Sequence, residues 1–137
     1  MPRDELVIMM STYEERRGHP ADFLVDYRFY PAAEGGRPSA PGQYYRGDFM
    51  FFEDAPDGAI HMIHHEFLDE GGVIFPEATS PVPERGGALM WIVSPRTRSL
   101  VRGRVEVGVR YFIMEGSRRV GEGVVTAVLG MRSNPLS

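Results

Sequence analysis

The chain has 137 residues, of which 42% are hydrophobic and 25% are charged, and its formal net charge at pH 7 is −4. This length and composition predict one globular domain with a single hydrophobic core. The absence of cysteine excludes disulfides, thiolate metal sites and cysteine nucleophiles, and it favours a reducing, cytoplasmic setting. No apolar stretch approaches the ~20 residues of a membrane-spanning helix, so we expect no membrane association.

Positive charge comes from arginine alone and is concentrated toward the C-terminus. Residues 1–89 carry 16 acidic side chains and 7 arginines, a net charge of −9, whereas residues 90–137 carry 3 acidic side chains and 8 arginines, a net charge of +5. The basic third predicts either a patch for an acidic partner or the solvated faces of strands. The absence of lysine excludes a G-x-x-x-x-G-K-[ST] phosphate loop, and therefore a P-loop GTPase.

The first segment predicts a helix over residues 3–17 that ends at Gly18 and Pro20, with a short strand over 7–10 as the alternative reading. From residue 22 the hydrophobic period changes to two, because apolar side chains alternate with Asp26 and Arg28. This alternation predicts a half-buried strand. Its inward side chains are Phe23, Val25, Tyr27 and Phe29.

The remaining elements predicted are short strands separated by turns rich in glycine and proline. The strands cover residues 44–52, 59–68, 73–75, 88–94, 105–111 and 120–129, and a tight turn over 115–118 joins the last two. Arg96, Arg98, Arg102 and Arg104 fall in a predicted exposed loop and strand start. Six or seven such strands in one domain predict an all-β fold, either an antiparallel β-barrel or a sandwich.

The C-terminal hairpin resembles a known family. Residues 109–125 read VRYFIMEGSRRVGEGVV, and the last hairpin of bacterial elongation factor Tu reads roughly LRFAIREGGRTVGAGVV. Upstream, EGGR at 34–37 resembles a loop of that family, and YRGDFMF at 45–51 resembles its Y-R-P-Q-F-Y-F strand. The resemblance spans residues 22–131 and implies the six-stranded antiparallel barrel of that factor's third domain. On this alignment, residues 1–21 form an N-terminal extension, for which a helix is one option. Residues 132–137 form a C-terminal tail.

The resemblance implies contacts with the T-stem of aminoacyl-tRNA, but few of those positions match. Asp48 stands in place of a strand glutamine and Asp57 in place of a turn threonine, whereas Glu115 matches the family's hairpin glutamate. Carboxylates beside phosphates add repulsion, so we expect tRNA binding in the family's mode to be weakened or lost. Tyr45 and Arg46 remain candidates for stacking or ion pairing.

A group of histidines is the only ligand-like cluster. On a strand, His61 and His65 share one face, and His64 and Glu66 share the other, so a metal needs a further ligand from elsewhere. The order H-x-x-H-H differs from the H-E-x-x-H of a zincin, and no G-x-S-x-G elbow is present. We therefore expect polar strand residues here, with no cofactor and no catalytic residues, and we regard the metal site and an enzyme built on it as the weaker alternatives.

Two functions follow from these observations. The first is a non-catalytic module that binds another protein in a role related to translation, including a decoy that imitates the factor's surface. The second is an RNA- or tRNA-binding accessory protein. The candidate contact residues for either are Tyr45, Arg46, Asp48, Asp57, Arg96, Arg98, Glu115, Arg118 and Arg119. An apolar face left by a missing neighbouring domain is expected to be covered by Leu6, Ile8, Met9 and Met10 or buried in a homo-oligomer.

Overall fold

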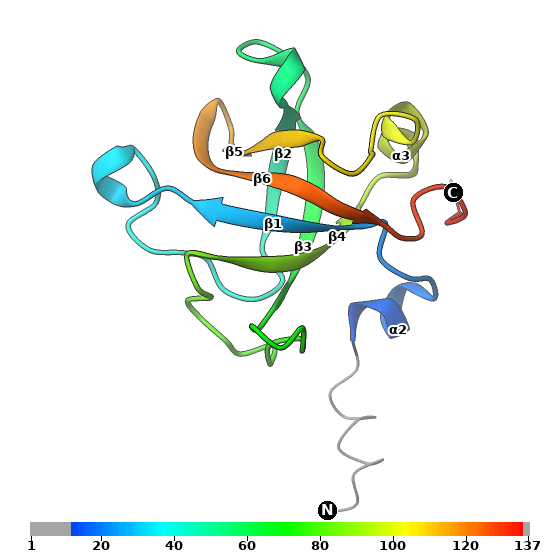
Figure 1. Ribbon diagram of the computed structural model, residues 1–137, viewed down its shortest axis with the longest axis horizontal. Coiled ribbons are helices and arrows are strands. Elements are labelled where there is room, and N and C mark those ends of the chain that lie inside the picture. Colours follow the sequence, from blue (N-terminus) through cyan, green and yellow to red (C-terminus); the bar gives the residue numbers. More distant parts are fainter. Residues whose placement is uncertain (1–11, 136–137) are drawn as a thin grey trace, which may run out of the picture.

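A computed structural model describes residues 12–135 of the chain, and they form a closed, six-stranded antiparallel β-barrel (Figure 1). The order of strands around the barrel is β1-β4-β3-β2-β5-β6. Their bounds are β1 Phe23–Phe29, β2 Arg46–Phe51, β3 His61–Leu68, β4 Arg85–Ile92, β5 Arg110–Glu115 and β6 Arg118–Val128. The all-β barrel expected from the sequence is confirmed.

The helical elements in the described part of the chain are short. The α-helices are α2 Tyr13–Arg17 and α3 Pro95–Val101, and the 3-10 turns are η1 Ala32–Glu34 and η2 Phe52–Asp54. Figure 1 shows α3 and the C-terminal segment at one end of the barrel, with the β5–β6 hairpin at the other. Within residues 12–135, no helix is long and apolar enough to span a membrane.

The interior of the barrel follows the alternation in the sequence. In β1, Phe23, Val25, Tyr27 and Phe29 are buried while Asp26 faces solvent. Burying each such side chain contributes roughly 1.5–3 kcal/mol before chain entropy is counted. The core therefore fixes the register of the strands, because a shift by one residue would turn these side chains outward.

Two glycines of β6 permit close approach, one of the neighbouring backbone and the other of an aromatic ring. A Cβ at Gly121 would lie 2.6 Å from the carbonyl oxygen of Arg28 on β1. A Cβ at Gly123 would overlap the phenol of Tyr111, which is 2% exposed inside the barrel. Glycine at these positions makes room for the neighbouring strand and for the ring.

Three predicted elements differ from the structure. The strand predicted from residue 105 begins only at Arg110, because two turns precede it and Gly108 adopts a left-handed φ of 93°. The strand predicted over 73–75 is reduced to a single bridge between Leu68 and Ile74. The loop predicted around Arg96 is instead α3, whose N-terminus is capped by the Ser94 hydroxyl accepting the Thr97 N–H.

The helix predicted over 3–17 is observed in its last turn. α2 ends at Gly18, whose φ of 76° and N–H bond to the Glu14 carbonyl close the helix as expected. The rest of that prediction, together with Leu6, Ile8, Met9 and Met10, lies outside the described residues.

Candidate functional site

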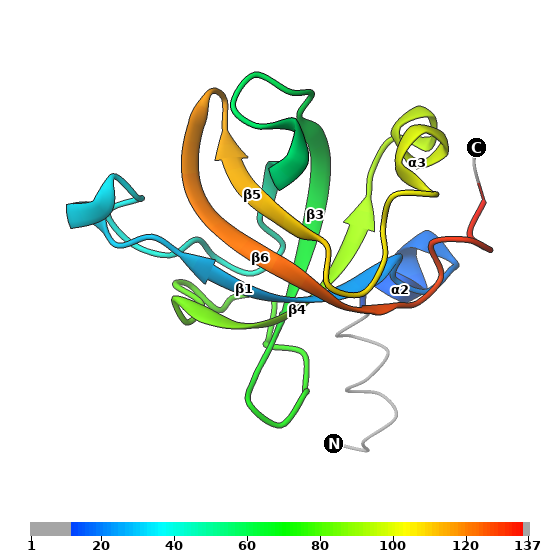
Figure 2. The same ribbon diagram turned by 45° about the horizontal axis from the view of Figure 1, so that its top comes forward.

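The outer face of the barrel carries a hollow between the β2–β3 connection and the β5–β6 hairpin. Figure 2 shows these two segments on the same side of the barrel. The hollow has a volume of about 530 Å³, and we call it the methionine hollow. It is lined by Met50, Pro56, Asp57, Gly58, Ile60, Met114, Gly116, Ser117 and Arg119.

Strand register explains why methionines line this hollow. Met50 and Met114 lie on the outward face of β2 and β5, where each is only 3% exposed and lines the hollow together with loop residues of the two connections. Ile60, directly before β3, and Met62, on β3, continue this apolar face and are 44% and 50% exposed. Asp48 lies between Met62 and Met114, because it is paired in register with Met62 on β3 and with Met114 on β5.

The methionine hollow has charged groups of both signs at its edge. Asp57 and Arg119 are exposed, and within residues 12–135 neither takes part in an ion pair. The structure thus brings these two sequence candidates to one site. Exposed apolar side chains beside unpaired charges are typical of a protein-binding surface.

A stack of arginine and phenylalanine side chains borders this face. The rings of Phe52 and Phe112 are stacked with their centroids 4.1 Å apart. The guanidinium of Arg110 lies 4.5 Å from the Phe52 centroid, and that of Arg119 lies 4.1 Å from the Phe112 centroid. We call these four side chains the arginine stack. Each cation–π contact holds a guanidinium in a fixed orientation at the surface.

Glu115 is engaged within the chain. Its carboxylate accepts a hydrogen bond of 2.6 Å from the Tyr45 hydroxyl and also pairs with Arg37. Burial, together with this carboxylate, raises the pKa of Tyr45 above its ordinary value. The neighbouring Arg118 donates to the carbonyl oxygens of Gly35 and Gly36, which fastens the β5–β6 hairpin to the loop after η1. These residues connect two loops of the barrel.

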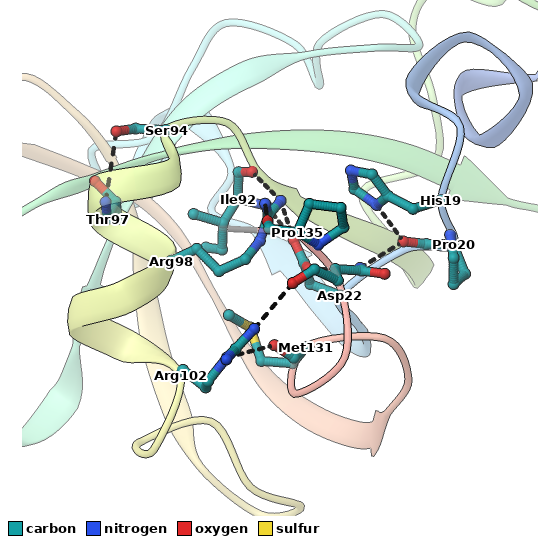
Figure 3. A network of polar contacts seen from close by, with 11 residues as sticks. His19, Pro20, Asp22, Ile92, Ser94, Thr97, Arg98, Arg102, Met131 and Pro135 are labelled. Carbon is teal, nitrogen blue, oxygen red and sulfur yellow. Dashed lines mark hydrogen bonds and ion pairs between the residues drawn. The ribbon is translucent and has the colours of Figure 1, made fainter. Parts of the chain in front are cut away.

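Arg98 is not a surface residue. The expectation of an exposed arginine loop fails here because α3 turns Arg98 into the end of the barrel, where it is 2% exposed (Figure 3). Its guanidinium donates to the Asp22 carboxylate and to the carbonyl oxygens of Ile92 and Pro135. Arg96, two residues earlier, is exposed, so the two arginines do not form one contact surface.

The histidines divide between the two faces of β3 as predicted. His61 and His65 point into the barrel, where His65 contacts Tyr45 and Phe67 at ring distances of 5.2 Å. His64 lies on the outer face, where it is covered by α2 and is 3% exposed. Burial lowers the pKa of His64 to about 3 and that of His65 to about 4. These two imidazoles are therefore neutral at physiological pH.

The histidine cluster does not converge on a metal site. Within residues 12–135, no three histidine, aspartate or glutamate side chains are close enough to hold an ion. Arg46, beside this cluster, donates to His64 at 3.4 Å and to the Tyr13 hydroxyl at 3.3 Å. It thus belongs to the contact between the barrel and α2, apart from the methionine hollow.

The sequence reading missed Met50, Met114, Phe52 and Phe112. The alternation of inward and outward residues in β2 and β5 places these side chains on the outer face. Their proximity, however, depends on the pairing of the two strands, which the sequence does not show. Comparison with known protein families and with curated proteins finds no match to this chain.

Proposed function

We propose that the chain is a non-catalytic binding module whose protein partner occupies the methionine hollow. The observation that carries the proposal is the exposed apolar face of Ile60 and Met62, which adjoins the hollow. Asp57 and Arg119 lie at the edge of this hollow and form no ion pair within residues 12–135. The half-exposed Met62 side chain is flexible and can adapt to a partner, and methionine, arginine and aromatic residues are enriched at protein interfaces.

The resemblance to the third domain of elongation factor Tu supports a role related to translation, in the cytoplasm. In this proposal the chain is a relative of that barrel, and its partner is a protein that recognises the factor or its surface. A six-stranded antiparallel barrel agrees with such a relationship. A decoy that captures a protein directed at the factor is the narrower form of the proposal.

Affinity capture with surface variants tests the proposal. The chain and its Ile60→Glu and Met62→Glu variants are used as bait in extracts of the cells that produce it. Both side chains are exposed, so these changes leave the fold intact while placing a charge on the apolar face. Val107→Glu, at a position 68% exposed outside the hollow, is the matched control.

The expected result is a partner retained by the parent chain and by Val107→Glu and lost with both hollow variants. Equal recovery with all four baits would place the interface elsewhere on the barrel and contradict the proposal.

The arginine stack favours RNA binding as the second candidate function. Arg119 lies on Phe112 without a carboxylate partner among the described residues, which leaves its N–H groups available to a phosphate. RNA binding predicts an affinity that falls steeply with salt and a shallower salt dependence in Arg119→Ala. Protein binding through the apolar face predicts little change with salt. Titration of aminoacyl-tRNA at two salt concentrations separates the two functions.

A further inference from the structure

Helix α2 packs on the barrel through Tyr13, and the guanidinium of Arg16 lies 4.9 Å from the ring centroid of Tyr44. Tyr13 is the only buried residue of α2, and its ring stacks on His64 with a centroid distance of 3.8 Å. The edge of Trp91 meets the same ring at 5.0 Å, and Arg46 donates to its hydroxyl. His64 and Trp91 are paired in register on β3 and β4, so Tyr13 covers the junction of these two strands.

Beneath α2 lies the carboxylate of Glu66, and α2 provides a hydrogen bond to only one of its two oxygens. Glu66 is fully buried, and its Oε2 accepts the backbone N–H of Tyr13 at 3.1 Å. Among residues 12–135, its Oε1 has no hydrogen-bond partner, and neither do the buried His64 Nε2 and Trp91 Nε1. We call this set the capped face, which comprises Tyr44, Arg46, His64, Glu66 and Trp91.

The fit between α2 and the capped face is poor in energetic terms. A buried polar atom without a partner is less stable than one that water can reach. Three such atoms lie under a helix of five residues, far shorter than the ~12 residues at which isolated helices become stable. Access of water to these atoms on undocking of α2 would offset part of the loss of the Tyr13 contacts.

We propose that the capped face is an interaction site that α2 keeps closed. Its ligand is a segment of a partner protein that places an aromatic ring on His64 and hydrogen-bond donors on both oxygens of Glu66. Such a segment reproduces the Tyr13 contact and also satisfies Oε1, which α2 leaves without a partner. A better match displaces α2, in the manner of a ligand that selects the open form.

The capped face adjoins the methionine hollow along the outer side of β3. His64 and Glu66 follow Met62 at every second residue, and the apolar side chains ahead of them are exposed, whereas α2 covers these two. The proposal rests on the contacts of α2, and its test uses no partner of the hollow. Its failure would leave the proposed function of the hollow unaffected.

Trp91 is the only tryptophan of the chain and reports directly on the site. The experiment compares the intact chain with its Tyr13→Ala variant by acrylamide quenching of Trp91 fluorescence. A synthetic peptide with the sequence of residues 11–19 is then titrated into each protein. The control is the same peptide carrying Tyr13→Ala. Far-UV circular dichroism shows that the barrel of the variant remains folded.

The expected result is stronger quenching of Trp91 in the Tyr13→Ala variant, reversed by the tyrosine peptide at roughly millimolar concentration and not by the control peptide. The intact chain should bind the peptide at least about tenfold more weakly, because its own α2 competes. Adding Glu66→Ala to the variant should abolish the reversal.

Unchanged quenching in a folded Tyr13→Ala variant would overturn the proposal, since the face would then be closed without the Tyr13 contact. Equal effects of the two peptides would also overturn it. A concentration-dependent dimer of the intact chain in which Trp91 is protected would assign the face to a second copy instead of a different partner.

Discussion

The guanidinium of Arg98 lies 3.2 Å from the carboxylate of Asp22, and both side chains are almost wholly removed from solvent. The two oxygens of Asp22 also accept the Ile92 backbone N–H at 2.7 Å and the Asn134 side-chain amide at 2.8 Å. One carboxylate thereby connects the start of β1, the end of β4, helix α3 and the C-terminal segment.

Removal of either partner leaves a buried charge without compensation, so Arg98→Ala should lower the free energy of unfolding by about 3–5 kcal/mol. Arg96→Ala, on the exposed side of the same helix, should change it by less than about 0.5 kcal/mol. Urea denaturation followed by circular dichroism measures both variants. A loss below about 1 kcal/mol for Arg98→Ala would show that the ion pair does not anchor the end of the barrel.

Acid should destabilise the fold because two buried histidines gain protons on unfolding. Burial lowers the pKa of His64 to about 3 and that of His65 to about 4, so the unfolded chain binds more protons than the folded chain below pH 6.5. Stability therefore falls as the pH falls, by about 2 kcal/mol for each histidine between pH 7 and pH 5.

Urea denaturation at the two pH values checks this dependence. A His64→Phe/His65→Phe double variant should lose most of it, whatever its absolute stability, whereas His19→Gln should retain it. The same slope in the double variant and in the parent chain would assign the acid sensitivity to other groups.

Glu66 predicts a pH dependence of the opposite sign. Burial raises its pKa, so its contribution to stability is present at acid pH and is lost as the pH rises through the folded-state pKa. Glu66→Gln retains an oxygen for the Tyr13 N–H and removes the buried charge. The variant should melt at a higher temperature than the parent at pH 8, and the difference should shrink as the pH falls. Melting temperatures that stay parallel across this range would contradict the assignment.

A methyl group at Gly123 should disturb the core. The added Cβ collides with the Tyr111 ring in the barrel interior, so Gly123→Ala should cost about 1–3 kcal/mol of stability by overpacking. Gly103→Ala is the matched control because its Cβ would meet no atom within 4 Å. The control should be neutral or slightly stabilising. Thermal denaturation of the two variants measures the difference, and equal midpoints would mean that the ring relaxes without cost.

Local pattern predicted the strands and failed where distant residues meet. The alternation from Phe23 to Phe29 was sufficient to identify β1, because one strand carries the whole signal. The burial of Arg98 depends on Asp22, 76 residues away, and no local pattern reports such a contact. Ser94 followed by Pro95 is a local sequence signal for the start of a helix, and it was not used when a loop was predicted here.

The candidate site shows the same division. Asp57 and Arg119 were named from the sequence, but their meeting at one hollow depends on the pairing of β2 with β5. The stack of Phe52 on Phe112 likewise joins a 3-10 turn to a strand far along the chain. Pairwise geometry of this kind arises from barrel closure, which brings together outward side chains that are remote in sequence.

Closure of the barrel also limits how this protein can recognise anything. Every strand is hydrogen-bonded on both sides, so the six strands offer no free edge to which a peptide could add as a seventh. The six strands therefore cannot bind a partner by main-chain hydrogen bonding, a mode of recognition that tolerates many sequences. A partner must be read through side chains and loops, and its specificity should therefore be sensitive to single substitutions at the points of contact.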